Sequence, residues 1–228
     1  MIEKILVVCP HPDDAEFGAA GTIAKWTDEG KEVFYVICTN GDKGSSDPNM
    51  TSERLANIRR KEQQAAADVL GVKEVVFLDY PDGGLEDTPQ FRGDIVRLIR
   101  LYKPRVLLTS DPQRQYIWHR DHRITGRVAL DAVFPYARDR LSYPEHEAAG
   151  LSPHKVEEIY CWGSDDPNLC IDITSTFERK LQALQCHKSQ IGGHRGRLED
   201  RVRERAAILG KEKCIPLAEA FYYIKMPI

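Results

Sequence analysis

Short apolar runs alternate with amphipathic stretches over the first 140 residues of the chain. The apolar runs are typical of strands buried on both faces, and they are Ile5–Cys9, Val33–Cys38, Val75–Leu78 and Arg105–Thr109. The amphipathic stretches have helical periodicity, and they are Phe17–Glu29, Ser52–Leu70 and Gln90–Tyr102. Strand–helix alternation with short connections predicts an α/β fold, a Rossmann-like, doubly wound and mostly parallel sheet with helices on both faces.

The pattern loosens after about Tyr136. We expect a loop over Ala137–Pro153 and two further strands, at Val156–Trp162 and Leu169–Ile173. Helical periodicity returns in Thr174–His187 and Leu198–Leu209. The sequence has no internal repeat and no linker-like segment. We therefore expect a single domain over residues 1–228, with a core α/β half at 1–136 and a C-terminal half at 137–228 that completes the cleft.

Composition and charge exclude several classes of protein. The chain has 228 residues, of which 42% are hydrophobic and 29% charged, so disorder is excluded as the dominant state. A net charge of −3 provides no positive field to attract nucleic acid or an anionic membrane. The apolar run at the N-terminus is too short for a signal-peptide core, and no run approaches the length of a membrane span. We expect a cytoplasmic protein, whose six scattered cysteines are reduced thiols.

A basic stretch near the C-terminus invites a nucleic-acid interpretation. Arg195, Arg197, Arg201, Arg203 and Arg205 lie close together, but acidic residues interleave with them and no aromatic residue accompanies them. This pattern favours a solvated helix over nucleic-acid binding.

Polar loops follow all four early strands, and two of them carry metal-competent groups. In a parallel sheet such loops converge at the carboxyl edge, where ligands bind. His11-Pro-Asp13-Asp14 follows the first strand, and His119-Arg-Asp121-His122 follows the fourth on a loop. A catalytic zinc site commonly has two imidazoles, one carboxylate and an open position. Adjacent aspartates in an extended turn cannot both reach one ion, so one can bind metal while the other faces the attacking water.

Other interpretations of these two motifs stay open on spacing alone. Asp13 or Asp14 could cap the helix that follows. His119 and His122, three residues apart on a helical turn, could both be ligands and close the coordination shell of a structural site.

The sequence also resembles a known family. Ile5–Asp14 followed by Gly18 and Gly21-Thr22 is similar to the opening of the LmbE-like (PIG-L) zinc N-acetylglucosaminyl deacetylases, and His119-x-Asp121-His122 is similar to their second signature. The resemblance continues to Ala218–Phe221 and so spans nearly the whole chain. One departure is Gly18-Ala-Ala-Gly21, where many members carry an extra glycine.

The resemblance implies roles for the residues of both motifs. His11, Asp14 and His122 would be the ligands of Zn²⁺, with Fe²⁺ as an alternative ion for the same shell. Asp13 would be the general base, and Asp121 would orient His119 and raise its pKa. Zinc and His119 would stabilise the oxyanion of an amide under attack by water.

Contacts to the substrate and between subunits are implied by the resemblance alone. Arg59 and Asp82 would bind hydroxyls of a glucosaminyl ring, although charged residues on a helix by default face solvent and Asp82-Gly83 is by default a turn. Family members assemble as trimers or hexamers, so we expect a homo-oligomer in which the C-terminal half makes contacts. His194 could reach a neighbouring subunit's site.

The leading hypothesis is a zinc-dependent removal of the N-acetyl group from a small molecule that contains N-acetylglucosamine. Within the same chemistry, the alternative is an amidase acting on another glucosaminyl amide, such as a conjugate of a low-molecular-weight thiol. A non-catalytic or cofactor-binding Rossmann-like domain is the second alternative. Against it, the first turn lacks Gly-x-Gly-x-x-Gly and places Asp13 and Asp14 where a pyrophosphate would need amides.

Overall fold

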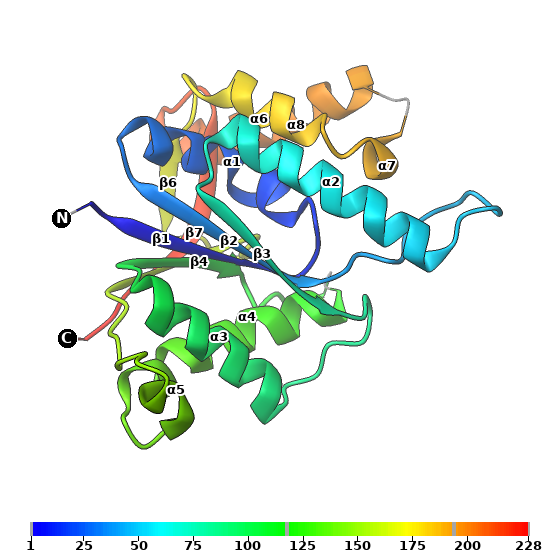
Figure 1. Ribbon diagram of the computed structural model, residues 1–228. Coiled ribbons are helices and arrows are strands. Elements are labelled where there is room, and N and C mark those ends of the chain that lie inside the picture. Colours follow the sequence, from blue (N-terminus) through cyan, green and yellow to red (C-terminus); the bar gives the residue numbers. More distant parts are fainter. Residues whose placement is uncertain (1, 117–118, 193–194, 228) are drawn as a thin grey trace.

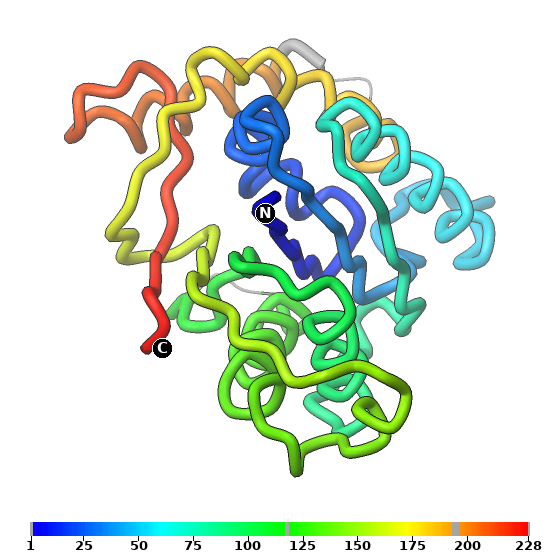
Figure 2. The backbone as a smooth tube through the Cα atoms, turned by 60° about the vertical axis from the view of Figure 1, so that its left-hand side comes forward, coloured from blue at the N-terminus to red at the C-terminus, as the bar shows by residue number. Residues whose placement is uncertain are grey.

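The computed structural model describes residues 2–116, 119–192 and 195–227, whose strands form one sheet in the order β3-β2-β1-β4-β5-β7-β6 (Figure 1). The first five strands in this order are parallel, and β7 runs antiparallel to both of its neighbours, β5 and β6. Figure 2 shows β6 and β7 side by side at one edge. The strands are β1 (Lys4–Cys9), β2 (Glu32–Thr39), β3 (Glu74–Tyr80), β4 (Val106–Ser110), β5 (Glu158–Trp162), β6 (Leu169–Asp172) and β7 (Ala218–Lys225).

Helices cover both faces of the sheet, which confirms the predicted fold class (Figure 1). One face carries α1 (Asp14–Asp28), α2 (Ser52–Leu70) and α6 (Phe177–Leu184), with α7 (Lys188–Ile191) and α8 (Arg195–Gly210) on the same side. The other face carries α3 (Pro89–Tyr102) and α4 (Arg120–Val133). The shorter helices are α5 (Pro144–Ala148), η1 (Tyr136–Arg138) and η2 (Lys211–Lys213). Among the described residues, no helix is long and apolar enough to cross a membrane.

The central strand β1 shows why the apolar runs are continuous. Ile5, Val7 and Cys9 pack into the cluster under α1 and α2, whereas Leu6 and Val8 pack into the cluster under α3 and α4. Because both faces are buried, alternation between polar and apolar residues is absent. The run therefore ends where the strand emerges at the carboxyl edge, at His11.

Two glycines let α1 lie directly against its neighbours. A Cβ at Gly18 would lie 2.5 Å from Trp162 Cδ1, and one at Gly21 would lie 2.7 Å from Ile173 Cβ. Both separations are far inside van der Waals contact, so a larger residue at either position would push α1 away. This close packing holds the start of α1, and with it Asp13 and Asp14, above the end of β1.

The structure corrects three predictions about local structure. His119-Arg-Asp121-His122 is not a loop, because α4 begins at Arg120 with His119 as its N-cap residue. The expected loop over Ala137–Pro153 contains α5 and the end of η1. The strand β7 was not predicted, because its buried Glu219 interrupts the apolar pattern and its charge is balanced by a residue of another element, Lys180.

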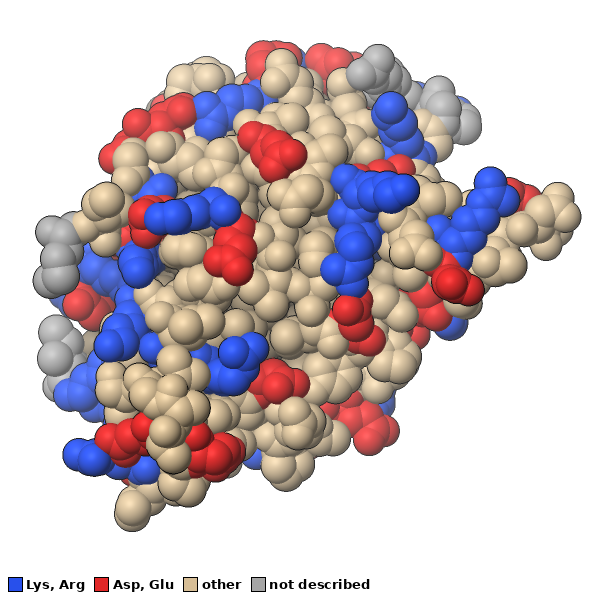
Figure 3. Space-filling view, in the orientation of Figure 1, with Lys and Arg blue, Asp and Glu red and all other residues tan. Residues whose placement is uncertain are grey.

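Basic and acidic side chains are intermixed over the face of the molecule shown in Figure 3. This view agrees with the small net charge of −3.

Candidate active site

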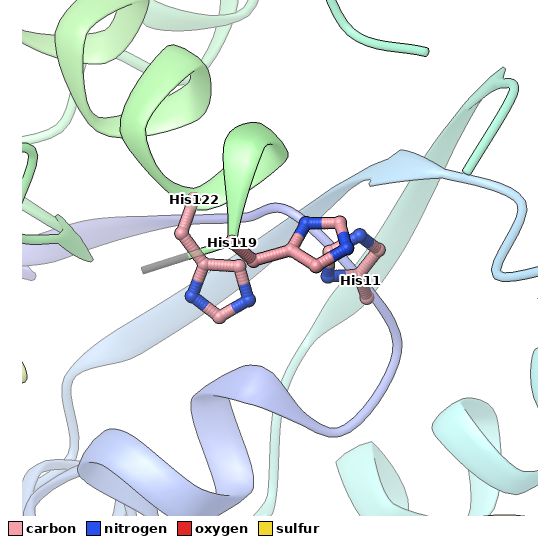
Figure 4. Close-up of side chains that lie close together, drawn as sticks. All are labelled: His11, His119 and His122. Atoms are coloured by element: carbon pink, nitrogen blue, oxygen red, sulfur yellow. The ribbon is translucent and has the colours of Figure 1, made fainter. Parts of the chain in front are cut away.

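Three histidines meet at the carboxyl edge of the central strands. His11 follows β1, whereas His119 and His122 come from the start of α4, and Figure 4 shows their rings gathered between these elements. One ring nitrogen of each lies within 4.8 Å of the others. The crossing from β1 to α4 is possible because β1 and β4 are adjacent parallel strands.

Asp14 lies between two of these imidazoles. Its Oδ2 is 3.0 Å from His11 Nδ1, and its Oδ1 is 3.2 Å from His122 Nε2. Burial disfavours the charged carboxylate, but the charge of His122 and the hydrogen bond from His11 outweigh it and lower the pKa of Asp14. Asp14 is therefore an anion with one oxygen directed at each ring.

The second nitrogen of His11 is held by two other carboxylates. His11 Nε2 lies 3.0 Å from Asp121 Oδ2 and 3.2 Å from Asp82 Oδ1. Burial opposes a charge on His11, but the hydrogen bonds with Asp121, Asp14 and Asp82 raise its pKa to about 12. Asp121 is itself fixed, since it accepts hydrogen bonds from the backbone N–H groups of Gly83 at 2.7 Å and Leu85 at 3.2 Å. With carboxylates on Nε2, Nδ1 is the nitrogen that could bind a cation together with Asp14.

Asp13 occupies an unusual backbone conformation beside this cluster. Its φ is 94°, in the left-handed region that L-residues rarely adopt. It stands at the N-cap position of α1, yet its side chain makes no capping hydrogen bond, so the structure does not support the capping interpretation. Burial, followed by the charge of Asp14, raises the pKa of Asp13 to about 7. Strain of this kind is found mainly where function requires a particular side-chain direction.

A buried hydrogen-bond chain that the sequence did not reveal holds Asp13 in place. The backbone N–H of Asp13 donates to Gln63 Oε1 at 2.9 Å, and Gln63 Nε2 donates to Glu16 Oε1 at 3.0 Å. His187 Nε2 lies 3.2 Å from the other oxygen of Glu16. Burial opposes a charge on His187, but its hydrogen bond with Glu16 raises its pKa. Gln63, Glu16 and His187 are all fully buried.

Arg59 is also buried, which contradicts the default expectation of a solvated side chain. It is 4% exposed, and it donates to the carbonyl oxygens of Pro12 at 2.6 Å, Gly41 at 3.1 Å and Lys43 at 3.3 Å. The spacing of residues along α2 could have predicted that Arg59 is buried. Leu55, Arg59, Gln63, Ala66 and Leu70 form the buried stripe of α2, and this three- or four-residue spacing places all of them on one face.

Arg59 also faces two carboxylates of the site. Its terminal nitrogens lie 3.6 Å from Asp13 Oδ1 and 3.6 Å from Asp82 Oδ2. Burial opposes a charge on Asp82, but the hydrogen bond from His11, followed by the charges of His11 and Arg59, lowers the pKa of Asp82. The site residues predicted after the strands and the predicted Arg59 therefore lie in one cluster.

His119 differs from the arrangement that the resemblance implied. Its Nδ1 accepts a hydrogen bond from the backbone N–H of Asp121 at 3.2 Å, but lies 4.0 Å from the carboxylate of Asp121. Burial, followed by the charge of His11, lowers the pKa of His119, so the expected rise is not found. The reason is geometric, because the Asp121 side chain points to His11 instead. The His119 side chain is 49% exposed.

The donor set fits a divalent cation. Two imidazole nitrogens and one carboxylate oxygen are a set common in catalytic zinc sites. Here they are His11 Nδ1, His122 Nε2 and an oxygen of Asp14. His11, Asp82, His119 and Asp121 form a second group of potential donors. It is the poorer candidate, because both oxygens of Asp121 already accept backbone hydrogen bonds. His194 lies outside the described residues.

Fold and site together have the form of a metal-dependent enzyme: a doubly wound sheet with imidazoles and carboxylates at its carboxyl edge. Residues 6–133 match the PIG-L family, described as GlcNAc-PI de-N-acetylase. The chain belongs to this family, and it is a hydrolase of N-acetyl amide bonds.

Its relatives include proteins named as deacetylases. The chain is 36% identical to diacetylchitobiose deacetylase of Thermococcus kodakarensis over 83% of this chain and 70% of the relative. It is 31% identical to a probable N-acetyl-alpha-D-glucosaminyl L-malate deacetylase 2 of Bacillus anthracis, over 82% of this chain and 80% of the relative. Among solved structures, N,N'-diacetylchitobiose deacetylase from Pyrococcus horikoshii superimposes with a TM-score of 0.93 at 33% identity, covering 98% of this chain and 84% of that one.

Proposed function

We propose that this protein removes the N-acetyl group from an N-acetylglucosamine unit of a small molecule, using zinc held by His11, Asp14 and His122. The observation that carries the proposal is the different environment of the two adjacent aspartates. Asp14 lies between two imidazoles, whereas Asp13 has a left-handed backbone, lies 3.6 Å from Arg59 and has a raised pKa. One carboxylate is thus suited to bind the metal and its neighbour to handle a proton.

A bound Zn²⁺ supplies a Lewis acid that polarises the amide carbonyl and makes a water more acidic. An open set of two imidazoles and one carboxylate occurs in catalytic zinc sites and also in iron(II) sites, so Fe²⁺ is the alternative ion for the same ligands. Asp121 and Asp82 support this set by orienting the ring of His11 through its other nitrogen.

Asp13 is assigned as the base that takes a proton from the attacking water and returns it to the departing amine. Its backbone N–H is anchored on Gln63, so the carboxylate direction is set by buried groups. The raised pKa suits a group that must both accept and release a proton near neutral pH. In this reaction the hydroxyl of the water becomes part of acetate, and its proton leaves with the amine.

His119 is assigned to stabilise the negative oxygen that develops on the amide carbon. Because its Nδ1 accepts the N–H of Asp121, the proton of the neutral ring is on Nε2. The His119 side chain is about half exposed, so we propose that this N–H donor contacts an entering substrate. Preorganised donors of this kind are a major source of rate enhancement in acyl transfer.

Arg59 and Asp82 are proposed as contacts to the hydroxyls of the sugar ring. They lie on the β3 side of His11 and face one another at 3.6 Å. Most of the Arg59 donors are engaged with backbone carbonyls, so we propose that Arg59 also stabilises the turn that carries Asp13.

The test is acetate release by the zinc-loaded protein from a panel of N-acetylglucosaminides, with Asp13→Asn as the blank. The panel contains free N-acetylglucosamine, diacetylchitobiose, and the malate and inositol conjugates of N-acetylglucosamine. We expect metal-dependent release from at least one of them and none with the variant. Release of no acetate by protein that binds about one zinc per chain would contradict this choice of substrate.

Assembly and location remain predictions from the sequence. We propose a cytoplasmic homo-oligomer, a trimer or a hexamer, which sedimentation measurements of the purified chain would test.

A further inference from the structure

One face of α8 carries a row of arginines that the proposed reaction does not use. Arg197, Arg201 and Arg205 are spaced four residues apart, so they lie on the same side of the helix. At 1.5 Å per residue the row is about 12 Å long. The helix packs beside β7, near α6 and α7 (Figure 1).

This row lines a cavity of about 740 Å³ that opens onto the candidate metal ligands. Asp14 and His122 form part of its lining, and Arg114, from the segment between β4 and α4, adds a fourth guanidinium. Trp162, Leu198 and Val202 contribute apolar wall. The cavity therefore combines positive charge, apolar surface and access to the site of reaction.

The positive charges in this cavity have few partners. Within the part of the chain that the structure describes, Arg197, Arg201 and Arg205 make no side-chain hydrogen bond or ion pair. Arg114 Nε is 3.9 Å from Asp165 and has no hydrogen-bond acceptor. Arg203, on the same helix but outside the cavity lining, pairs with Glu178 at 3.0 Å and Glu199 at 3.3 Å.

The acidic groups that line the cavity are already engaged. Glu219 accepts from Lys180 Nζ at 2.6 Å and from the backbone N–H groups of Gly21 and Thr22. Asp14 lies between His11 and His122. Several guanidinium groups thus face one cavity without a neutralising partner. Such an arrangement attracts anions.

The place of the cavity indicates which part of a substrate would enter it. Arg59 and Asp82, the proposed sugar contacts, lie toward β3 and do not line the cavity, which lies toward β5 and β7. The histidines stand between the two. A sugar bound on the first side therefore directs its aglycone into the second.

We propose that the cavity under α8 binds an anionic aglycone, and that Arg197, Arg201 and Arg205 make this protein selective for N-acetylglucosaminides that carry a carboxylate or phosphate beyond the sugar. This inference rests on the proposed deacetylase function. The length of the row suits an anionic group at the end of an extended arm, or more than one such group. The apolar wall suits a ring or short alkyl segment between sugar and anion.

The test compares three glycosides of N-acetylglucosamine that differ only at the end of the aglycone: phenyl, 4-carboxyphenyl and 4-phosphonooxyphenyl. We expect kcat/KM for acetate release to be at least about 10-fold higher for an anionic glycoside than for the phenyl one. The difference should appear in KM, because the contact is equally strong in ground and transition states. It should shrink as salt concentration rises. The carboxylate and phosphate arms identify which anion is preferred.

The variant Arg201→Gln/Arg205→Gln should lower the ratio of anionic to neutral kcat/KM by about 10-fold. Arg203→Gln is the matched control, since this residue lies on the same helix but pairs with Glu178, and it should leave the ratio unchanged. Equal kcat/KM values for all three glycosides, or a ratio unaffected by the double variant, would overturn the proposal. So would a double variant that changes the sedimentation mass but not the ratio, because the row would then be a contact between copies of the chain.

A binding measurement separates failure of this inference from failure of the proposed function. The deacetylated product, 4-carboxyphenyl glucosaminide, is titrated into the protein and its double variant by calorimetry. Binding that is weakened in the double variant supports the arginine row even where no acetate is released. Acetate release with product binding that is the same in both proteins would refute the row and leave the deacetylase intact.

Discussion

The two ends of the cavity differ in how their charges are paired. At the histidine end, Asp14, Asp121 and His11 are buried or nearly so, and each has two or more polar partners. At the α8 end, Arg197, Arg201 and Arg205 are exposed and unpaired within the described chain. Buried charges must be paired to be tolerated at all, and pairing fixes their geometry. Exposed charges are hydrated and adaptable. The paired charges therefore suit a rigid reaction centre, and the unpaired arginines suit a surface that binds an anionic ligand.

Among the changes to the histidine end of the cavity, removal of the metal should reduce acetate release the most. Dialysis against a chelator should abolish acetate release, and added Zn²⁺ should restore it. His122→Ala should lower the zinc content of the purified protein, whereas His154→Ala, whose ring bonds the Pro104 carbonyl away from the site, should not. Full zinc content in both His122→Ala and Asp14→Ala would overturn the ligand set. Elemental analysis provides the measurement.

Asp13→Asn should retain zinc but reduce kcat by several orders of magnitude, because the amide cannot accept the proton. Asparagine tolerates the left-handed backbone found at this position, so the turn should persist. Steady-state kinetics together with zinc content test this expectation. An active variant would remove Asp13 from the role of base.

His119→Ala should reduce kcat by roughly 10²–10³, the loss expected for one donor to the oxyanion. His119→Asn is the informative partner, since asparagine is a good N-cap and can still accept the N–H of Asp121. The asparagine variant should regain the thermal stability of the parent without regaining its kcat. Recovery of both together would make His119 a capping residue only.

Gln63→Leu should have the smallest effect on turnover, about 10-fold in kcat, through a less well positioned Asp13. It should also lower the free energy of unfolding by about 1–3 kcal/mol, because the Asp13 N–H and Glu16 lose a buried partner. Gln64→Leu is the control, since the neighbouring Gln64 is exposed and its side-chain amide donates to Asp68 on the same helix. Denaturant titration and kinetics of the two variants should separate them.

Local pattern accounted for most of the fold. The four early apolar runs became β1–β4 and the three amphipathic stretches became α1–α3, because apolar runs and helical periodicity are properties of short segments. The expected burial of Val75–Leu78 on both faces was wrong, since β3 is the edge strand and is only partly buried. The start of α4 was misjudged because His119 is an uncommon N-cap residue. The strand β7 was missed because Glu219 is neutralised only by Lys180, which is 39 residues away in the chain.

For the site, the residue types and the edge of the sheet were predictable, whereas the pairings were not. His11 and Asp121 are separated by 110 residues, and no local rule states that this carboxylate faces His11 rather than His119. The spacing of Arg59 and Gln63 along α2 matches its buried face, but because both residues are polar they were expected to face solvent.

By itself the sequence determined most of the strands and helices, the family, and the two motifs that carry imidazoles and carboxylates, because these depend on neighbours along the chain. Only the tertiary structure decided which carboxylate each histidine bonds, how Asp13 is held by Gln63, and which arginines of α8 face the cavity. The physical reason is that hydrogen bonds, burial and fields act over a few ångströms in space. Groups that meet in this way can lie anywhere in the sequence.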